Sequence, residues 1–179
     1  YGQQPGDVHL LDKDMNYKYD NTDKEFMGTR MPRLRWSMRN DFTLFKNLNI
    51  SFNMYSYIGH KQSSARFTND NALLNVTNQI KCDYWTPENR NNEYPRLANK
   101  KPAGVSYSIY KNASFLRFDN ISIGYTFPKK LIEPLRIQNL NVNATMKNAG
   151  YISGWPGYDP ENSEKNTPRV IYFGINLTL

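Results

Sequence analysis

Residues 173–179, FGINLTL, end this chain on a strand-like alternation of apolar and polar side chains. The apolar positions are Phe173, Ile175, Leu177 and Leu179. Because successive side chains of a strand point to opposite faces, one face of this strand is apolar and the other carries Gly, Asn and Thr. A strong strand at the very end is typical of an outer-membrane β-barrel, whose last strand pairs with the first and removes an edge that lipid does not tolerate.

Four further segments show the same two-residue period. They are residues 34–44, 50–58, 115–127 and 140–146. A tilted transmembrane strand needs about ten residues, which fits these lengths. The first two segments are close enough to form a tight hairpin. In the third, the alternation continues only if one residue is skipped, which predicts a β-bulge at Asp119–Asn120. One short helical turn is expected within Lys129–Arg136.

Connector lengths alternate between long and short along the chain. Long polar connectors are expected at about 1–33, 60–112 and 147–168. In outer-membrane barrels the long loops are extracellular and the short turns are periplasmic. The sequence therefore predicts an all-β fold whose long loops face outward and whose last residue, Leu179, lies at the periplasmic end.

Composition excludes other classes of protein. The mean hydropathy is −0.76, and no apolar run approaches the roughly 20 residues of a membrane-spanning helix. A helical membrane protein is therefore excluded. The net charge is +7, but Lys and Arg are scattered and form no basic stripe with interleaved aromatic residues, so we expect no nucleic-acid partner. A soluble carbohydrate-binding β-sandwich is a further alternative, because aromatic side chains could also form its core.

Several short motifs occur together and in a family order. They are PGDVHLLDKDMN at 5–16, LFKNLNIS at 44–51, WTPEN at 85–89, YPR at 94–96, SFLRFDNISIGYTFP at 114–128, YDPE at 158–161 and the closing YFGINLTL. Together they resemble the carboxy-terminal segment of a SusC-family (SusC/RagA-like) TonB-dependent outer-membrane transporter. The resemblance covers nearly the whole chain.

The resemblance implies a barrel of about 22 strands, with a plug domain and a TonB box that lie outside this sequence. It also implies import of oligosaccharides or oligopeptides together with a SusD-like surface lipoprotein that caps the barrel. Five strands cannot close a barrel, since even the smallest use about eight. The expected partners are therefore the remainder of the same barrel, the SusD-like lid, outer-membrane lipid, and the TonB complex through the absent amino-terminal part.

Residues Gly174, Leu177 and Leu179 resemble the carboxy-terminal signal that the barrel-assembly machinery recognises. Leu179 departs from the family pattern, because many outer-membrane proteins end on Phe. We expect recognition to be retained but weakened.

Two sets of side chains are candidates for binding. Aromatic residues in the long loops could stack on sugars or grip a partner: Tyr84, Trp85, Tyr94, Trp155 and Tyr158. The alternative is that they pack the loops together, above all Trp85 in its WTPEN motif. Strand parity also places a set of side chains on the lumen side, where substrate would pass: Arg35, Arg39, Tyr55, Tyr57 and Arg117.

One acidic loop has the spacing of a calcium site. Its oxygen-bearing residues are Asp12, Asp14, Asn16, Asp20 and Asp23. Alternate oxygens can wrap a calcium ion. Tyr17 stands where the sharp turn favours Gly, and the last position is Asp rather than Glu, so a solvated acidic loop is the alternative.

No catalytic constellation accompanies these candidates. His9 and His60 lie in connectors, and no nucleophile and base share a scaffold. We therefore expect no enzymatic activity and no cofactor other than calcium. A barrel adhesin or receptor that transports nothing remains the alternative to an importer.

Overall fold

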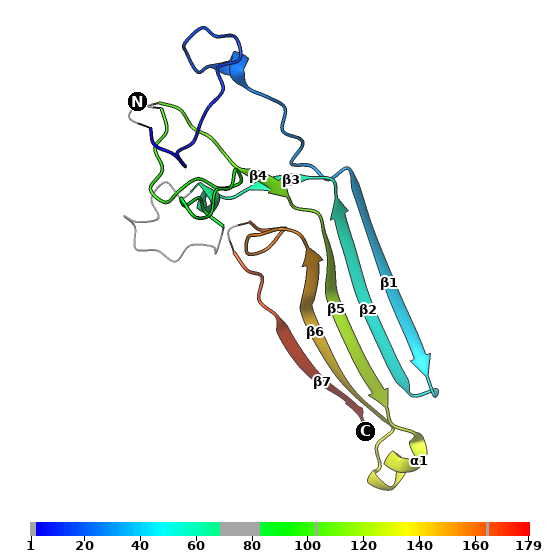
Figure 1. The fold of residues 1–179 in the computed structure, drawn as a ribbon. Coiled ribbons are helices and arrows are strands. Elements are labelled where there is room, and N and C mark those ends of the chain that lie inside the picture. Colours follow the sequence, from blue (N-terminus) through cyan, green and yellow to red (C-terminus); the bar gives the residue numbers. More distant parts are fainter. Residues whose placement is uncertain (1–2, 69–82, 103, 164) are drawn as a thin grey trace.

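The computed structural model describes residues 3–68, 83–102, 104–163 and 165–179 (Figure 1). Its main element is a five-stranded antiparallel sheet whose strands follow one another in sequence order. The strands are β1 (Leu34–Leu44), β2 (Leu48–Ile58), β5 (Phe115–Thr126), β6 (Asn139–Ser153) and β7 (Val170–Thr178). Long connectors gather at one end of the sheet, here called the loop end, and short turns at the other, the turn end (Figure 1). The predicted meander is confirmed.

Smaller elements lie between these strands. They are the 3-10 helices η1 (Asn21–Asp23), η2 (Ala65–Phe67) and η3 (Glu133–Leu135), the helix α1 (Lys129–Ile132), and a two-stranded sheet of β3 (Lys61–Ser63) and β4 (Tyr110–Asn112). Together α1 and η3 form the helical turn predicted at Lys129–Arg136. Within the described ranges, no helix combines the length and the apolar character needed to cross a membrane.

A tight turn joins β1 to β2. Phe45 and Lys46 both adopt the left-handed conformation, with φ of 50° and 67°. Two consecutive left-handed residues match the twist of a hairpin, and the Asn47 N–H donates to the Leu44 carbonyl at 3.2 Å. The Asn47 side-chain amide also donates to the Thr126 carbonyl at 2.6 Å, which ties this turn to the end of β5.

The predicted bulge is present in β5. Pairing with both neighbouring strands shifts register at Asp119, because Phe118 pairs with Met54 whereas Asn120 pairs with Asn53. The extra residue returns Ile121 to the face that carries Phe118. One unpaired residue therefore keeps the apolar face of the sheet continuous.

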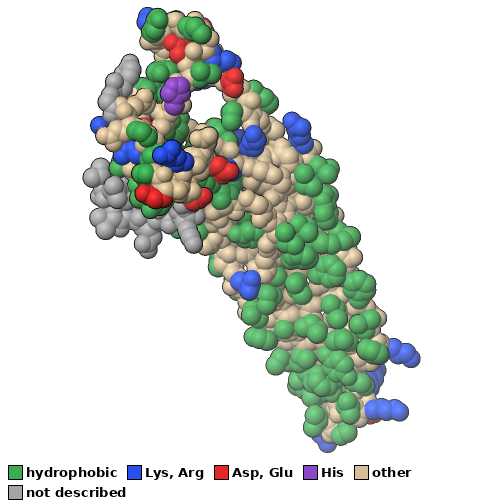
Figure 2. Space-filling model, in the orientation of Figure 1, with side chains coloured by type: hydrophobic (Ala, Val, Ile, Leu, Met, Phe, Trp, Pro, Cys, Tyr) green, Lys and Arg blue, Asp and Glu red, His purple; other side chains and the backbone are tan. Residues whose placement is uncertain are grey.

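The two faces of the sheet differ sharply in polarity. One face is apolar across all five strands, as Figure 2 shows. A typical row across it, from β1 to β7, is Phe42, Ile50, Ile123, Ala144 and Phe173. The neighbouring row on the other face is Thr43, Asn49, Gly124, Asn143 and Gly174. Phe173 is 83% exposed and Ile175 is 73% exposed, so this apolar face of β7 lies open rather than forming a core.

The strand β6 is longer than predicted. It continues to Ser153, which pairs with Phe115, so the connector expected from residue 147 begins only after Ser153. Asn148 has a φ of 49° and interrupts the regular pairing without ending the strand. Of the other predicted connectors, residues 1–2, 69–82 and 103 lie outside the described residues.

The buried core lies in the connectors at the loop end. It is formed by Phe67, Tyr94, Ala113 and Trp155, with Ile109 packed against them. The ring of Phe67 lies 5.9 Å from that of Tyr94 and 5.2 Å from that of Trp155, between centroids. The connector between β2 and β5 and the connector between β6 and β7 thus share one apolar cluster beside the sheet.

Candidate functional site

The polar face carries the side chains predicted to line a lumen. They are Arg35, Arg39, Tyr55, Tyr57 and Arg117. Strand register brings four of them together at the loop end, since Arg35 pairs with Tyr57 and Tyr55 pairs with Arg117. Arg39 lies farther toward the turn end, where its exposed guanidinium pairs with Asp41 at 2.9 Å. A role in lining a lumen stays a prediction for all five.

Aromatic rings organise this group. The centroids of Tyr55 and Tyr57 lie 5.5 Å apart, and those of Tyr57 and Phe115 lie 5.2 Å apart. The guanidinium of Arg35 lies over the Tyr57 ring at 5.0 Å, and that of Arg117 lies 5.2 Å from the Tyr151 ring. Guanidinium groups are attracted to aromatic faces, so the rings fix the direction of both arginines.

A buried ion pair anchors the connector between β6 and β7 to this face. Arg117 is 3% exposed and Asp159 is 1% exposed, and the Arg117 guanidinium donates to the Asp159 carboxylate. The same guanidinium donates to the Asn148 side-chain oxygen at 2.5 Å. The Thr167 hydroxyl and the Glu161 N–H donate to Asp159, both at 2.9 Å. These contacts satisfy the buried carboxylate from three directions.

Burial and hydrogen bonding act on Asp159 in opposite senses. Burial raises the pKa of the carboxyl group, but the Glu161 N–H, the Thr167 hydroxyl and Arg117 outweigh it and hold the pKa of Asp159 below its ordinary value. A carboxylate that accepts several hydrogen bonds stays ionised. Asp159 therefore remains charged at neutral pH, as the buried Arg117 requires.

The anchored connector also carries Glu161 onto the polar face. The Tyr55 hydroxyl donates to Glu161 Oε2 at 2.7 Å, and Arg117 Nε lies 3.4 Å from the same oxygen. A cleft of about 470 Å³ opens here, between β1, β2 and the connector. Its polar and aromatic lining includes Arg35, Ser37, Asn53, Tyr55, Tyr57 and Glu161.

Asp159 and Glu161 were not among the residues selected from the sequence as candidates. Both belong to the YDPE motif at 158–161, one of the motifs that carry the family resemblance. That motif was the available signal, because two carboxylates in a connector otherwise look like ordinary solvated residues.

The candidate loop aromatics divide into two groups. Tyr94 and Trp155 are buried in the core of the connectors, where they hold the loops together. Tyr84 is exposed, and Trp85 and Tyr158 are half-buried. The guanidinium of Arg66 lies 5.2 Å from the Tyr158 ring. A binding role stays a prediction for this second group.

Sequence comparison relates the chain to receptors of one kind. No family model matches it. It is 24% identical over 163 residues to TonB-dependent receptor P3 of Formosa agariphila, covering 90% of this chain and 16% of that protein. It is also 24% identical over 177 residues to TonB-dependent receptor P26 of the same organism, covering 87% of this chain and 18% of that protein. The chain therefore spans less than a fifth of the length of these curated relatives.

The fold is that of part of a solved importer. The chain superposes on a chain of the RagAB peptide importer in its closed-closed state with a TM-score of 0.66 and 21% identity, covering 89% of this chain and 19% of that one. For the open-open state the TM-score is 0.64 with 19% identity, covering 97% and 20%. The resemblance to SusC-like TonB-dependent receptors is confirmed. The five-stranded sheet is a segment of this type of β-barrel fold.

Two of the motifs that carry the family resemblance meet in the loops. Asp7 of PGD accepts hydrogen bonds from Arg96 Nε of YPR at 2.6 Å and from the Lys100 N–H at 2.9 Å. The Arg96 N–H donates in turn to the Gly6 carbonyl at 2.8 Å. A Cβ on Gly6 would lie 2.4 Å from the Trp85 ring, so glycine permits this close approach. These motifs hold the connectors together.

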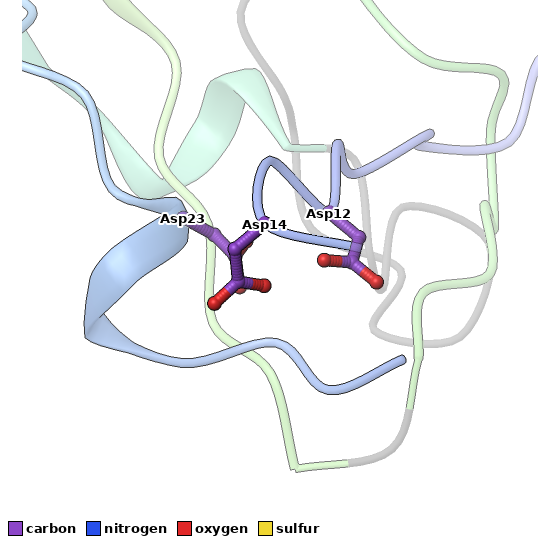
Figure 3. A group of neighbouring side chains, drawn as sticks. All are labelled: Asp12, Asp14 and Asp23. Carbon is purple, nitrogen blue, oxygen red and sulfur yellow. The ribbon is translucent and has the colours of Figure 1, made fainter. Parts of the chain in front are cut away.

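The acidic loop brings together three of its five predicted calcium ligands. Asp12, Asp14 and Asp23 offer carboxylate oxygens within 4.8 Å of one another, and Figure 3 shows their arrangement. Asp20 instead caps η1 by accepting the Thr22 N–H at 2.8 Å. The Asn16 amide donates to Asp14 at 2.8 Å. Calcium binding stays a prediction.

The closing strand carries a glycine where a neighbouring side chain approaches it closely. A Cβ at Gly174 would lie 2.6 Å from Asn143 Oδ1 on β6, so any larger residue displaces the Asn143 side chain. Leu177 and Leu179 are 50% and 77% exposed and make no core. Recognition of these residues by the assembly machinery stays a prediction.

Proposed function

We propose that this chain forms part of the wall of a TonB-dependent outer-membrane transporter that imports oligopeptides or oligosaccharides. The open apolar face of the five-stranded sheet carries this proposal. Monomeric soluble proteins rarely expose large apolar patches, whereas a transmembrane barrel presents such a band to lipid. The loop end then faces the outside of the cell and the turn end faces the periplasm.

The polar face of the same sheet becomes the lumen side in this arrangement. Its asparagine, serine and threonine side chains suit a hydrated interior. The cleft between Arg35, Tyr57 and Glu161 lies on that face at the loop end, where a substrate entering from outside would first meet the wall. Import rather than catalysis is the activity that the arrangement supports, and the similar proteins are named as receptors and peptide importers.

Partners follow from the same proposal. The remaining strands of the barrel would pair with the free edges of β1 and β7, since unpaired backbone groups in lipid cost several kcal/mol each. A SusD-like lipoprotein would cover the loop end, as a two-component importer of the RagAB kind suggests. Coupling to TonB would use parts of the protein outside this sequence.

Uptake by cells that carry the intact protein tests the proposal. The gene is deleted, then complemented, and entry of fluorescent tetrapeptides and of neutral tetrasaccharides is measured with and without TonB. The proposal predicts uptake of one probe class that requires both the intact protein and TonB. Surface binding of a probe without TonB-dependent entry would instead favour a barrel receptor or adhesin. A water-soluble protein absent from the outer-membrane fraction would refute the membrane assignment.

A further inference from the structure

The cleft on the polar face is lined by two oppositely charged side chains, Glu161 and Arg35, which differ in their contacts. Glu161 is engaged, because its carboxylate accepts the Tyr55 hydroxyl at 2.7 Å and lies 3.4 Å from Arg117 Nε. Arg35 is exposed, and its guanidinium makes a ring contact with Tyr57 at 5.0 Å. The Arg35 guanidinium makes no side-chain hydrogen bond or ion pair to any residue that the structure describes.

The position of Arg35 is nevertheless well defined. Tyr57 lies directly opposite Arg35 in the hairpin register, and the Tyr57 ring is itself supported by Tyr55 at 5.5 Å and Phe115 at 5.2 Å. Stacking on a supported ring orients the planar guanidinium while leaving its hydrogen-bond donors directed elsewhere. A donor fork held in this way loses little rotamer freedom when a ligand binds.

The charge of Arg35 also acts on its surroundings. His60, which follows β2, is 3% exposed. Burial is the main cause that lowers the pKa of His60, and the positive charge of Arg35 lowers it further. His60 is therefore held neutral at neutral pH, so the positive charge at this end of the cleft is that of Arg35.

We propose that Arg35, seated on Tyr57, binds a carboxylate group of the transported ligand. Guanidinium and carboxylate match in a two-bond, bidentate geometry that is about twice as strong as neutral hydrogen bonding. The cleft of about 470 Å³ is large enough for one residue of an oligomer. The carboxylate could belong to a peptide or to an acidic sugar. This inference rests on the proposed transport function and names the chemistry of its ligand.

The contacts of Glu161 make a cationic ligand less favourable in this cleft than a carboxylate ligand. A ligand ammonium group would have to compete with Tyr55 and the buried Arg117 for that carboxylate. Drawing the Glu161 carboxylate away from these contacts would deprive the buried Arg117 guanidinium of one of its negatively charged partners. Arg35 can take a carboxylate without breaking any ion pair among the described residues.

Equilibrium binding to the purified intact transporter tests the proposal. The probes are tetra-alanine with a free carboxy-terminus and its carboxy-terminal amide, and trigalacturonic acid and its methyl ester. The proposal predicts that the acid of at least one pair binds better than its neutral form. Arg35→Gln should reduce that preference by roughly tenfold to a hundredfold, the range for losing a charge-assisted hydrogen-bond pair. Arg35→Lys should keep part of it.

Lys46→Gln provides the charge-matched control. Lys46 is exposed in the turn between β1 and β2, at the turn end of the sheet and far from the cleft, so its substitution should leave the preference unchanged. The proposal is overturned if Arg35→Gln keeps the full preference, if Lys46→Gln removes it equally, or if neither acid is preferred. Binding that depends on Arg35 without any cellular uptake would support this site while refuting transport. The pair that shows the preference identifies the ligand as peptide or sugar.

Discussion

Replacing Asp159 with Asn should release the connector between β6 and β7 from the sheet. Asp159 is 1% exposed and is the main partner of the buried Arg117. Removing one partner of a buried ion pair costs about 3–5 kcal/mol, because the other charge is left without compensation. The hydrogen bonds from Thr167 and from the Glu161 N–H, both 2.9 Å, are weakened by the same change.

The loss should appear as local opening of the connector rather than unfolding of the barrel. The ion pair joins a connector to the sheet, and the ladders of β5, β6 and β7 do not depend on it. Since about 1.4 kcal/mol corresponds to a tenfold change in an equilibrium, the open population should rise on the order of a hundredfold or more. Trypsin cleavage after the exposed Lys165 measures that population in the intact protein.

Two further variants make this experiment decisive. Asp41→Asn breaks the exposed pair with Arg39, which contributes little to stability because solvent screens it, and should leave cleavage after Lys165 unchanged. The double variant Arg117→Met with Asp159→Leu should recover much of the protection, because a matched apolar pair leaves no buried charge. Unchanged cleavage in Asp159→Asn, or equal acceleration in Asp41→Asn, would refute the reasoning.

Three other predictions concern separate parts of the chain. Gly174→Val should destabilise the β6–β7 pairing by about 1–3 kcal/mol, because the new side chain collides with Asn143. The measurement is the melting temperature of the assembled protein, which should fall. An unchanged melting temperature would contradict the close approach. Burial, with Arg35 adding to it, lowers the pKa of His60 below 6.5, so its stabilising contribution is complete above pH 6.5 and is lost as pH falls toward that lowered pKa. Melting curves between pH 7.5 and 5.5 should show this loss for the native protein and not for His60→Asn. The control His9→Asn, at the exposed histidine of the amino-terminal connector, should show the same loss as the native protein. Calorimetric titration of the intact protein should detect calcium uptake that disappears when Asp12 and Asp14 are both replaced by Ala; identical heats in the two proteins would exclude the site.

The strands could be predicted from the sequence because a two-residue period is a local signal. It placed β1 at its observed bounds and located the bulge at Asp119, where one skipped residue restores the apolar face. It failed at the end of β6, where Lys147 and Asn148 interrupt the alternation. The Asn148 side chain accepts a hydrogen bond from Arg117, a tertiary contact that no local pattern reveals.

The candidate site was predictable only in part, for the same reason. Parity places Arg35, Tyr57 and Arg117 on one face, but it does not show that a connector returns to that face. Asp159 is 42 residues from its partner Arg117, so its burial depends on tertiary contacts. Likewise, the sequence could not separate Trp155, which is buried in the loop core, from the exposed Tyr84.

In the proposed arrangement, the apolar face of the sheet contacts lipid and the opposite face lines an aqueous lumen. Nitroxide labels placed singly at cysteines substituted for residues 173 to 178 of the intact, membrane-reconstituted protein test it most directly. We predict that labels at 173, 175 and 177 collide readily with oxygen dissolved in lipid and weakly with a water-soluble nickel complex. Labels at 174, 176 and 178 should show the reverse. Equal accessibility along the strand, or high nickel contact at 173, 175 and 177, would contradict the claim.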